Sequence, residues 1–417
     1  MILEIDVLVA LTVAPGDPPA PAKISLEEAV ELARTVTPRV EEIRGLKFKR
    51  PVAVRVVDDQ TARRHFEARI AKEYPEARLR ADERAYAQLG LIPAGTQLLT
   101  GFLDILEEQA GGFYDPESDT FYVLDDMPKA VGPVLVAHEL THALDDQHYG
   151  IDGMLDQVKE DDDRAAAVGA VVEGSGTLVM TAFLMQEMQA GRLQLEALAE
   201  LQKSEAGQGA RLTAALPFLR RSLLSSYALG FPFLLRGDLL KLTSFDPADL
   251  NRAFEKPPAS SEQILHPEKY WEAAKADAPV AVAMPDLAKL LGPGWALAGH
   301  GTLGELNLAL LTDAPTPNGN SPDAMVAAAW TNDAAAGIGG DAYQHYANGA
   351  KGETVLATVW DTEKDAVEFE KALRPLPDRR AYRRRAAVVV VAGDVPRQVE
   401  ALVSAVFAGL KGSKSAE

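Results

Sequence analysis

The stretch "AAAVGAVVEGSGTLVMTAFLM", residues 165 to 185, constrains the fold most, because it is apolar over nearly the length of a membrane span. Glu173 lies near its centre, and a carboxylate at that depth of a bilayer would be very costly. We therefore expect a long helix buried inside the protein and no transmembrane segment. The acidic run "EDDDR" at 160–164 suits the N-terminus of this helix, where the helix dipole favours negative charge.

Charge and cysteine content exclude several classes of function. The 417 residues carry a net charge of −19, which argues against nucleic acid and anionic membrane surfaces as partners, since both attract basic patches. The chain has no cysteine. Disulfides, thiolate metal sites and cysteine nucleophiles are therefore excluded, and any metal must be held by His, Asp or Glu.

The order of the elements predicts an α+β protein that is mainly helical. Ser25 and Glu28 form the capping box of a helix over 25–46, the aromatic stretch 111–126 predicts a β-hairpin, and 382–394 predicts one strand. We expect four parts: an N-terminal tail or degenerate secretory signal (1–23), an α/β subdomain (24–150), a helical subdomain (151–274) and a smaller, separate α+β module (275–417).

The N-terminus bears on the location of the protein in the cell. A short apolar run is followed by small residues and prolines, a pattern that slightly favours a secreted or periplasmic protein over a cytoplasmic one. Glu4 and Asp6 stand where a secretory signal carries basic residues. A simple N-terminal tail is therefore the alternative interpretation.

Residues 138–142 read His-Glu-Leu-Thr-His. On a helix, residues i and i+4 share a face, so the imidazoles of His138 and His142 can reach one ion. Glu139 lies about 100° round the helix, where it can hold a water against the metal and take its proton. A surface helix with two unrelated histidines is the alternative. The apolar segment "VGPVLVA" before the motif indicates a buried helix and favours the metal site.

A catalytic zinc needs a third protein ligand, for which two candidates compete. His148 completes the spacing of the metzincins, but only if the chain turns at Asp145; on a continuing helix it points about 240° away from His142. Glu173 is the rival, since a metal would offset the cost of burying its carboxylate. Small neighbours such as Gly176 would let the two helices approach closely. We favour Glu173, with a salt bridge to a distant arginine as the alternative.

The segments "HELTHALDDQHYG" and "VVEGSGTLVM" together resemble the gluzincin zinc metallopeptidases, in particular a group of bacterial members. The resemblance covers about 50–270. It implies one zinc ion per chain held by His138, His142 and Glu173, Glu139 as general base and acid, and a peptide or protein as substrate. In gluzincins the hairpin before the first helix offers an edge strand to an extended peptide, and residues 118–124 match that strand.

Further positions match the family less closely. Tyr227-x-x-Gly230 resembles the Y-x-x-G of gluzincin aminopeptidases, which implies that the tyrosine hydroxyl stabilises the tetrahedral oxyanion; the alternative is an ordinary packed aromatic. The Gly-rich strand with which those enzymes bind a free amine is absent. An endopeptidase or a peptidase of narrow specificity is therefore favoured.

Two other side chains are candidates for the same site. Asp146 follows His142 by four residues on the same helix face and is expected to accept a hydrogen bond from a ligand imidazole, or else to be a solvated helix-end carboxylate. His266, before Pro267, is expected near the substrate, or else to be a fixed turn residue.

The sequence thus predicts a zinc-dependent peptidase with a gluzincin-like core: a small sheet, an active-site helix and a helical subdomain. Two alternatives stay open. One is a non-catalytic, metal-containing binding protein whose working surface is the C-terminal module. The other is a zinc hydrolase with a non-peptide substrate. The presence of Glu139 favours an enzyme.

Overall fold

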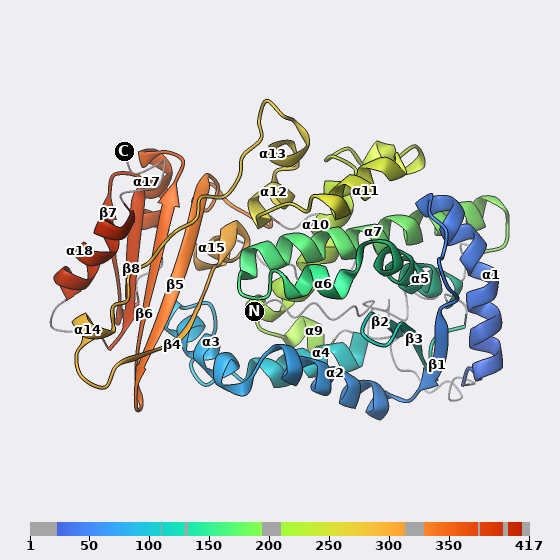
Figure 1. Cartoon of the computed structure of the whole chain (residues 1–417), viewed down its shortest axis with the longest axis horizontal. Helices are drawn as coiled ribbons and strands as arrows, with labels where there is room; N and C mark the ends of the chain where they lie inside the picture. The colour runs from blue at the N-terminus through green and yellow to red at the C-terminus, as the bar shows by residue number, and fades with distance from the viewer. Residues whose placement is uncertain are drawn as a thin grey trace.

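The computed structural model describes residues 23–109, 111–129, 132–193, 210–312, 329–373, 376–394 and 399–410. The predicted tail or signal therefore lies outside the described residues, apart from Lys23. The protein is α+β and mainly helical, as expected. Two sheets lie at opposite ends of the long axis, with most of the helices between them (Figure 1).

The first end consists of a helix and a three-stranded sheet. Helix α1 (Leu26–Arg44) begins at the predicted capping box of Ser25 and Glu28. The sheet has the order β1-β3-β2, formed by β1 (Ala53–Val57), β2 (Gly112–Asp115) and β3 (Thr120–Leu124). Strands β2 and β3 are the predicted hairpin. The prediction that residues 118–124 offer an edge is wrong, because β3 is the central strand and pairs with both β1 and β2, which form the two edges.

A series of helices fills the middle of the molecule. Three of them connect β1 to β2: α2 (Asp59–Glu73), α3 (Glu76–Leu89) and α4 (Leu98–Gln109). The His-Glu-Leu-Thr-His motif lies on α5 (Gly132–Tyr149), and the long apolar stretch lies on α7 (Asp162–Gln189). The others are α6 (Ile151–Asp156), α9 (Ala210–Ala214), α10 (Pro217–Leu234), η1 (Leu239–Thr243), α11 (Pro247–Glu255), α12 (Ser261–Leu265) and α13 (Glu268–Trp271).

Helix α7 runs along the middle of the molecule and packs against α5 and α10 (Figure 1). Asp161 caps its N-terminus by accepting a hydrogen bond from the Arg164 amide. The helix is long and apolar enough to cross a membrane, but most of its apolar window is buried inside the protein. It approaches α10 so closely that a Cβ atom on Gly230 would lie 1.8 Å from the carbonyl oxygen of Ala170. Glycine is therefore required at this crossing.

The other end of the molecule is built around a five-stranded antiparallel sheet with the order β4-β5-β6-β8-β7. The predicted strand over 382–394 is two strands, β7 and β8, because the chain reverses at Arg385, whose φ is +51°. The elements are α14 (Ala288–Leu291), β4 (Ala296–Gly301), α15 (Gly304–Leu311), β5 (Ile338–Asn348), β6 (Lys351–Trp360), α17 (Glu363–Ala372), β7 (Arg379–Arg384), β8 (Ala387–Gly393) and α18 (Val399–Gly409).

The C-terminal module shares a hydrophobic core with the helical part. One continuous cluster contains Tyr86 of α3, Phe102 of α4, Leu306 of α15, and Leu356 and Trp360 of β6. The opposite face of the same sheet packs on α18 in a second core. The elements from β4 to α18 thus form an α+β unit, but one face of its sheet is buried against the rest of the chain.

Candidate metal centre

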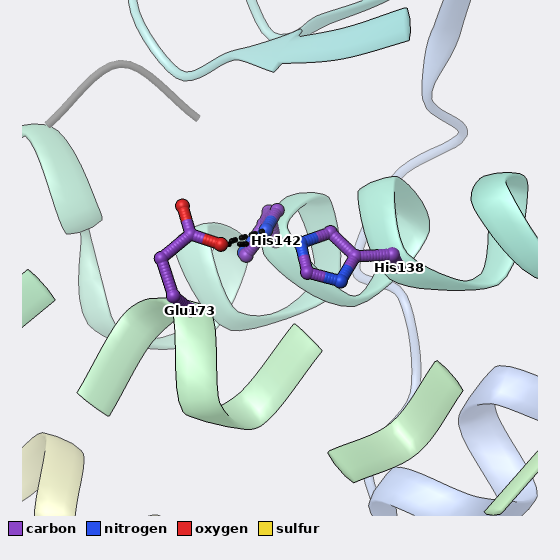
Figure 2. A group of neighbouring side chains, drawn as sticks. All are labelled: His138, His142 and Glu173. Carbon is purple, nitrogen blue, oxygen red and sulfur yellow. Dashed lines mark hydrogen bonds and ion pairs between the residues drawn. The ribbon is translucent and has the colours of Figure 1, made fainter. Parts of the chain in front are cut away.

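Helices α5 and α7 bring His138, His142 and Glu173 together (Figure 2). Oε2 of Glu173 lies 3.2 Å from Nε2 of His138 and 3.7 Å from Nε2 of His142. In a tetrahedral zinc site with bonds of about 2.0–2.1 Å, neighbouring ligand atoms lie about 3.3 Å apart. The three side chains therefore fit the spacing of ligands around one zinc ion.

The chemical state of the two imidazoles also suits a metal. Burial lowers the pKa of His138 to about 3 and that of His142 to about 4, with His138 lowering the second further. Both rings are thus neutral at pH 7, the form that binds metal ions. Nδ1 of His138 and both ring nitrogens of His142 are buried without a hydrogen-bond partner among the described residues. A cation bound at Nε2 would satisfy one of the two nitrogens of His142.

Helix α5 continues through Asp145, so the turn that the metzincin spacing requires is not formed. Asp145 is fully buried: one oxygen lies 2.7 Å from Nε of Arg44, and the other accepts a 2.6 Å hydrogen bond from the Ser175 hydroxyl. His148 instead bonds the main-chain oxygen of Lys47 at 2.8 Å. The structure therefore groups Glu173, and not His148, with the two histidines.

Glu139 faces the small sheet. Its Oε2 accepts a 2.8 Å hydrogen bond from the main-chain amide of Tyr114, and its side chain is buried. Tyr114 belongs to β2. One edge of β2 pairs with β3, and the other, outer edge is next to α5. The candidate base, next to His138 in the sequence, is thus hydrogen-bonded to the outer edge of β2.

Tyr227 lies beside His138 of the metal group, and the role of its hydroxyl stays a prediction. Its ring packs parallel to that of His138, with 6.0 Å between the ring centroids and 22° between the planes. The glycine at position 230 is also explained by packing, since the absence of a side chain allows α10 to approach α7 closely. The close crossing of these two helices brings Tyr227 to His138.

The prediction for Asp146 is wrong. Its carboxylate accepts hydrogen bonds from the hydroxyl of Tyr114 and from the amide of Ile151, both at 2.8 Å. Because neither ring nitrogen of His142 has a hydrogen-bond partner among the described residues, Asp146 does not orient that imidazole. It links the start of α6 to β2 instead.

His266 lies outside the metal group, and we drop it from the candidate site. Its Nε2 lies 3.0 Å from Oε1 of Glu305, a hydrogen bond that raises the pKa of His266. His266 directly follows α12. This helix is hydrogen-bonded to the beginning of α7, because the amide of Ser261 in α12 donates to Asp163 in α7. Asp163 precedes Glu173 by ten residues, a rise of about 15 Å along an α-helix.

A second group of carboxylates consists of Glu262, Asp277 and Asp361. The ammonium of Lys269 lies among them, with Nζ–oxygen distances of 2.6, 2.9 and 3.7 Å. A side chain of the protein itself therefore supplies positive charge at the centre of this group.

Residues 295–405 match the model of one family, described as a domain of unknown function (DUF8575). The match covers the C-terminal module from β4 into α18 and none of the metal group. No curated protein and no solved structure is significantly similar to this chain.

Proposed function

We propose that this protein is a zinc-dependent metallopeptidase that hydrolyses bonds in a peptide or protein substrate. The observation that carries the proposal is the convergence of His138, His142 and Glu173 from two buried helices, with Glu139 beside them. The three side chains would hold one zinc ion per chain. The small sheet, α5 and the helical subdomain would then form a core of the gluzincin type.

The chemistry of the proposed site divides between the metal and the chain. A bound zinc ion supplies Lewis acidity, which polarises the scissile carbonyl and makes water easier to deprotonate. Glu139 would accept the proton of the attacking water and pass it to the leaving nitrogen. Its hydrogen bond to the Tyr114 amide holds the carboxylate in place. Tyr227 would donate its hydroxyl to the developing oxyanion.

Replacement of Glu139 by glutamine tests the proposal most directly. The amide oxygen of glutamine can still accept the Tyr114 hydrogen bond, so the fold and the zinc ligands are preserved, but the amide cannot take the water proton. We expect zinc content like that of the wild type, about one per chain by elemental analysis, and a loss of peptide hydrolysis of about 100-fold or more. Cleavage is measured on a peptide library.

The control is wild-type protein with and without a chelator, which should lose and regain cleavage as zinc is removed and restored. Glu139→Gln protein that cleaves at the wild-type rate would rule out this mechanism. Zinc-bound wild-type protein that cleaves no peptide would favour the metal-containing binding protein or a hydrolase of a non-peptide substrate.

A further inference from the structure

Gly176 lies on α7 three residues after Glu173, and its main chain contacts both candidate ligand histidines. A Cβ atom built on it would lie 2.7 Å from Cε1 of His138, 2.8 Å from Cε1 of His142 and 2.9 Å from Nδ1 of His138. These distances are shorter than van der Waals contact. The bare backbone at Gly176 is therefore packed against the Cε1 atoms of both rings.

No protein group among the described residues forms a hydrogen bond with the Nδ1 atom of either ring. A histidine that binds a metal through Nε2 almost always donates its Nδ1–H to a carboxylate, carbonyl or water. Here Nδ1 of His138 and Nδ1 of His142 are buried without such a partner in the described part of the chain. A steric contact is present instead: Gly176 packs against Cε1 of both rings and against Nδ1 of His138.

We propose that Gly176 is the positioning residue of the metal centre. Its backbone packs against both imidazoles, and this steric contact directs their Nε2 atoms toward Glu173. Packing thus takes the role that a hydrogen-bond acceptor has in other zinc sites. The inference rests on the proposed function, because it assigns an orienting role toward the same zinc ion.

The surroundings of α7 prevent the helix from moving away from the rings. On the α5 side, the hydroxyl of Ser175 donates to Asp145, which is paired with Arg44. On the opposite side, a Cβ on Gly174 would lie 2.4 Å from the carbonyl carbon of Gly230. An added methyl group at position 176 must therefore be accommodated by rotation of the imidazoles.

The test compares Gly176→Ala with Gly153→Ala. Gly153 also lies within a helix, α6, but a Cβ there meets no atom within 4 Å, so this control reproduces the gain in helix propensity without a steric contact. We expect Gly176→Ala to bind zinc about 10- to 100-fold more weakly in a competition titration with a chromophoric chelator. Its cobalt-substituted absorption spectrum should also change. Gly153→Ala should match the wild type in both.

A second measurement does not depend on the folding of the variant. In zinc-free wild-type protein labelled at histidine Cε1, the Hε1 protons of His138 and His142 should both show nuclear Overhauser effects to the Hα protons of Gly176. Absence of both effects would overturn the proposal. So would zinc affinity and a cobalt spectrum in Gly176→Ala equal to those of the wild type, with the proposed function left intact. Wild-type protein that takes up no zinc would overturn the proposed function and this inference together.

Discussion

At the level of single residues, the free-energy cost of burying the Glu173 carboxylate was the reason to expect it beside the two histidines of α5, where a shared metal ion would offset that cost. The Glu173 carboxylate lies 3.2 Å from Nε2 of His138 and 3.7 Å from Nε2 of His142, which favours a metal ligand over the alternative, a salt bridge to a distant arginine. Arg44, which is fully buried, pairs with Asp145. The sequence contains no local signal for that pair, because the partners are 101 residues apart.

Alanine substitutions at Glu173 and His148 distinguish the two candidate third ligands. Glu173→Ala removes a carboxylate that lies within 3.7 Å of both imidazole Nε2 atoms, so zinc affinity should fall by about 100-fold or more. His148→Ala removes only a hydrogen bond to the Lys47 carbonyl and should leave zinc affinity unchanged. A zinc titration gives both values, and the reverse order would restore the metzincin spacing.

Glu353 should make stability depend on pH. It is fully buried on β6, and neither carboxylate oxygen has a hydrogen-bond partner among the described residues. Burial, with a smaller effect of Asp394, raises the pKa of Glu353 from 4.5 to about 8. The neutral acid is favoured in the folded protein, so its contribution to stability is complete below pH 4.5 and is lost as the pH rises through 8.

We therefore compare the unfolding free energies of Glu353→Gln and the wild type. The difference between them should shift in favour of the variant by about 1–3 kcal/mol from pH 4.5 to pH 8. Chemical denaturation at a series of pH values measures the difference. Glu255→Gln, at an exposed position, is the control and should give no such trend. Parallel pH profiles of Glu353→Gln and the wild type would show that Glu353 is ionised in the folded state.

At the level of elements, α7 holds the site together because it packs closely on two sides. The sequence predicted its burial, its acidic N-terminus and the value of small residues around Glu173, since all three are local properties of one helix. It did not predict that β3 would be a central strand, because pairing with β1 joins residues far apart in the chain. The turn between β7 and β8 was also missed, since Arg385 is not a residue typical of positive φ.

Gly230→Ala should separate α7 from α10. The new Cβ would lie 1.8 Å from the carbonyl oxygen of Ala170 and 2.9 Å from Cα of Gly174, main-chain atoms that cannot rotate aside. We expect a loss of at least about 1–3 kcal/mol of unfolding free energy, in spite of the higher helix propensity of alanine. Thermal or urea unfolding measures it. Gly153→Ala is again the control, and equal stability of the two variants would mean that the crossing is looser than described.

At the scale of the whole molecule, the shared core joins the DUF8575-like region to α3, α4 and α10, and α10 packs against α7, which carries Glu173. Leu356 is fully buried on β6 within the cluster that includes Tyr86 and Phe102. Leu356→Ala should therefore lower the stability of the entire chain by about 2–5 kcal/mol. Calorimetry should show one transition, and release of zinc should follow the same curve. Two separate transitions, with only the transition of the C-terminal module shifted by Leu356→Ala, would show that the module folds independently.

The lysine within the second carboxylate group affects how a chelation experiment on this protein can be interpreted. An ammonium that is covalently part of the chain cannot be extracted by EDTA, whereas an exchangeable ion can. Lys269 already supplies positive charge to Glu262 and Asp277. Treatment with a chelator should therefore leave this group intact, and of the two groups found in the described part of the chain only the proposed histidine centre should change.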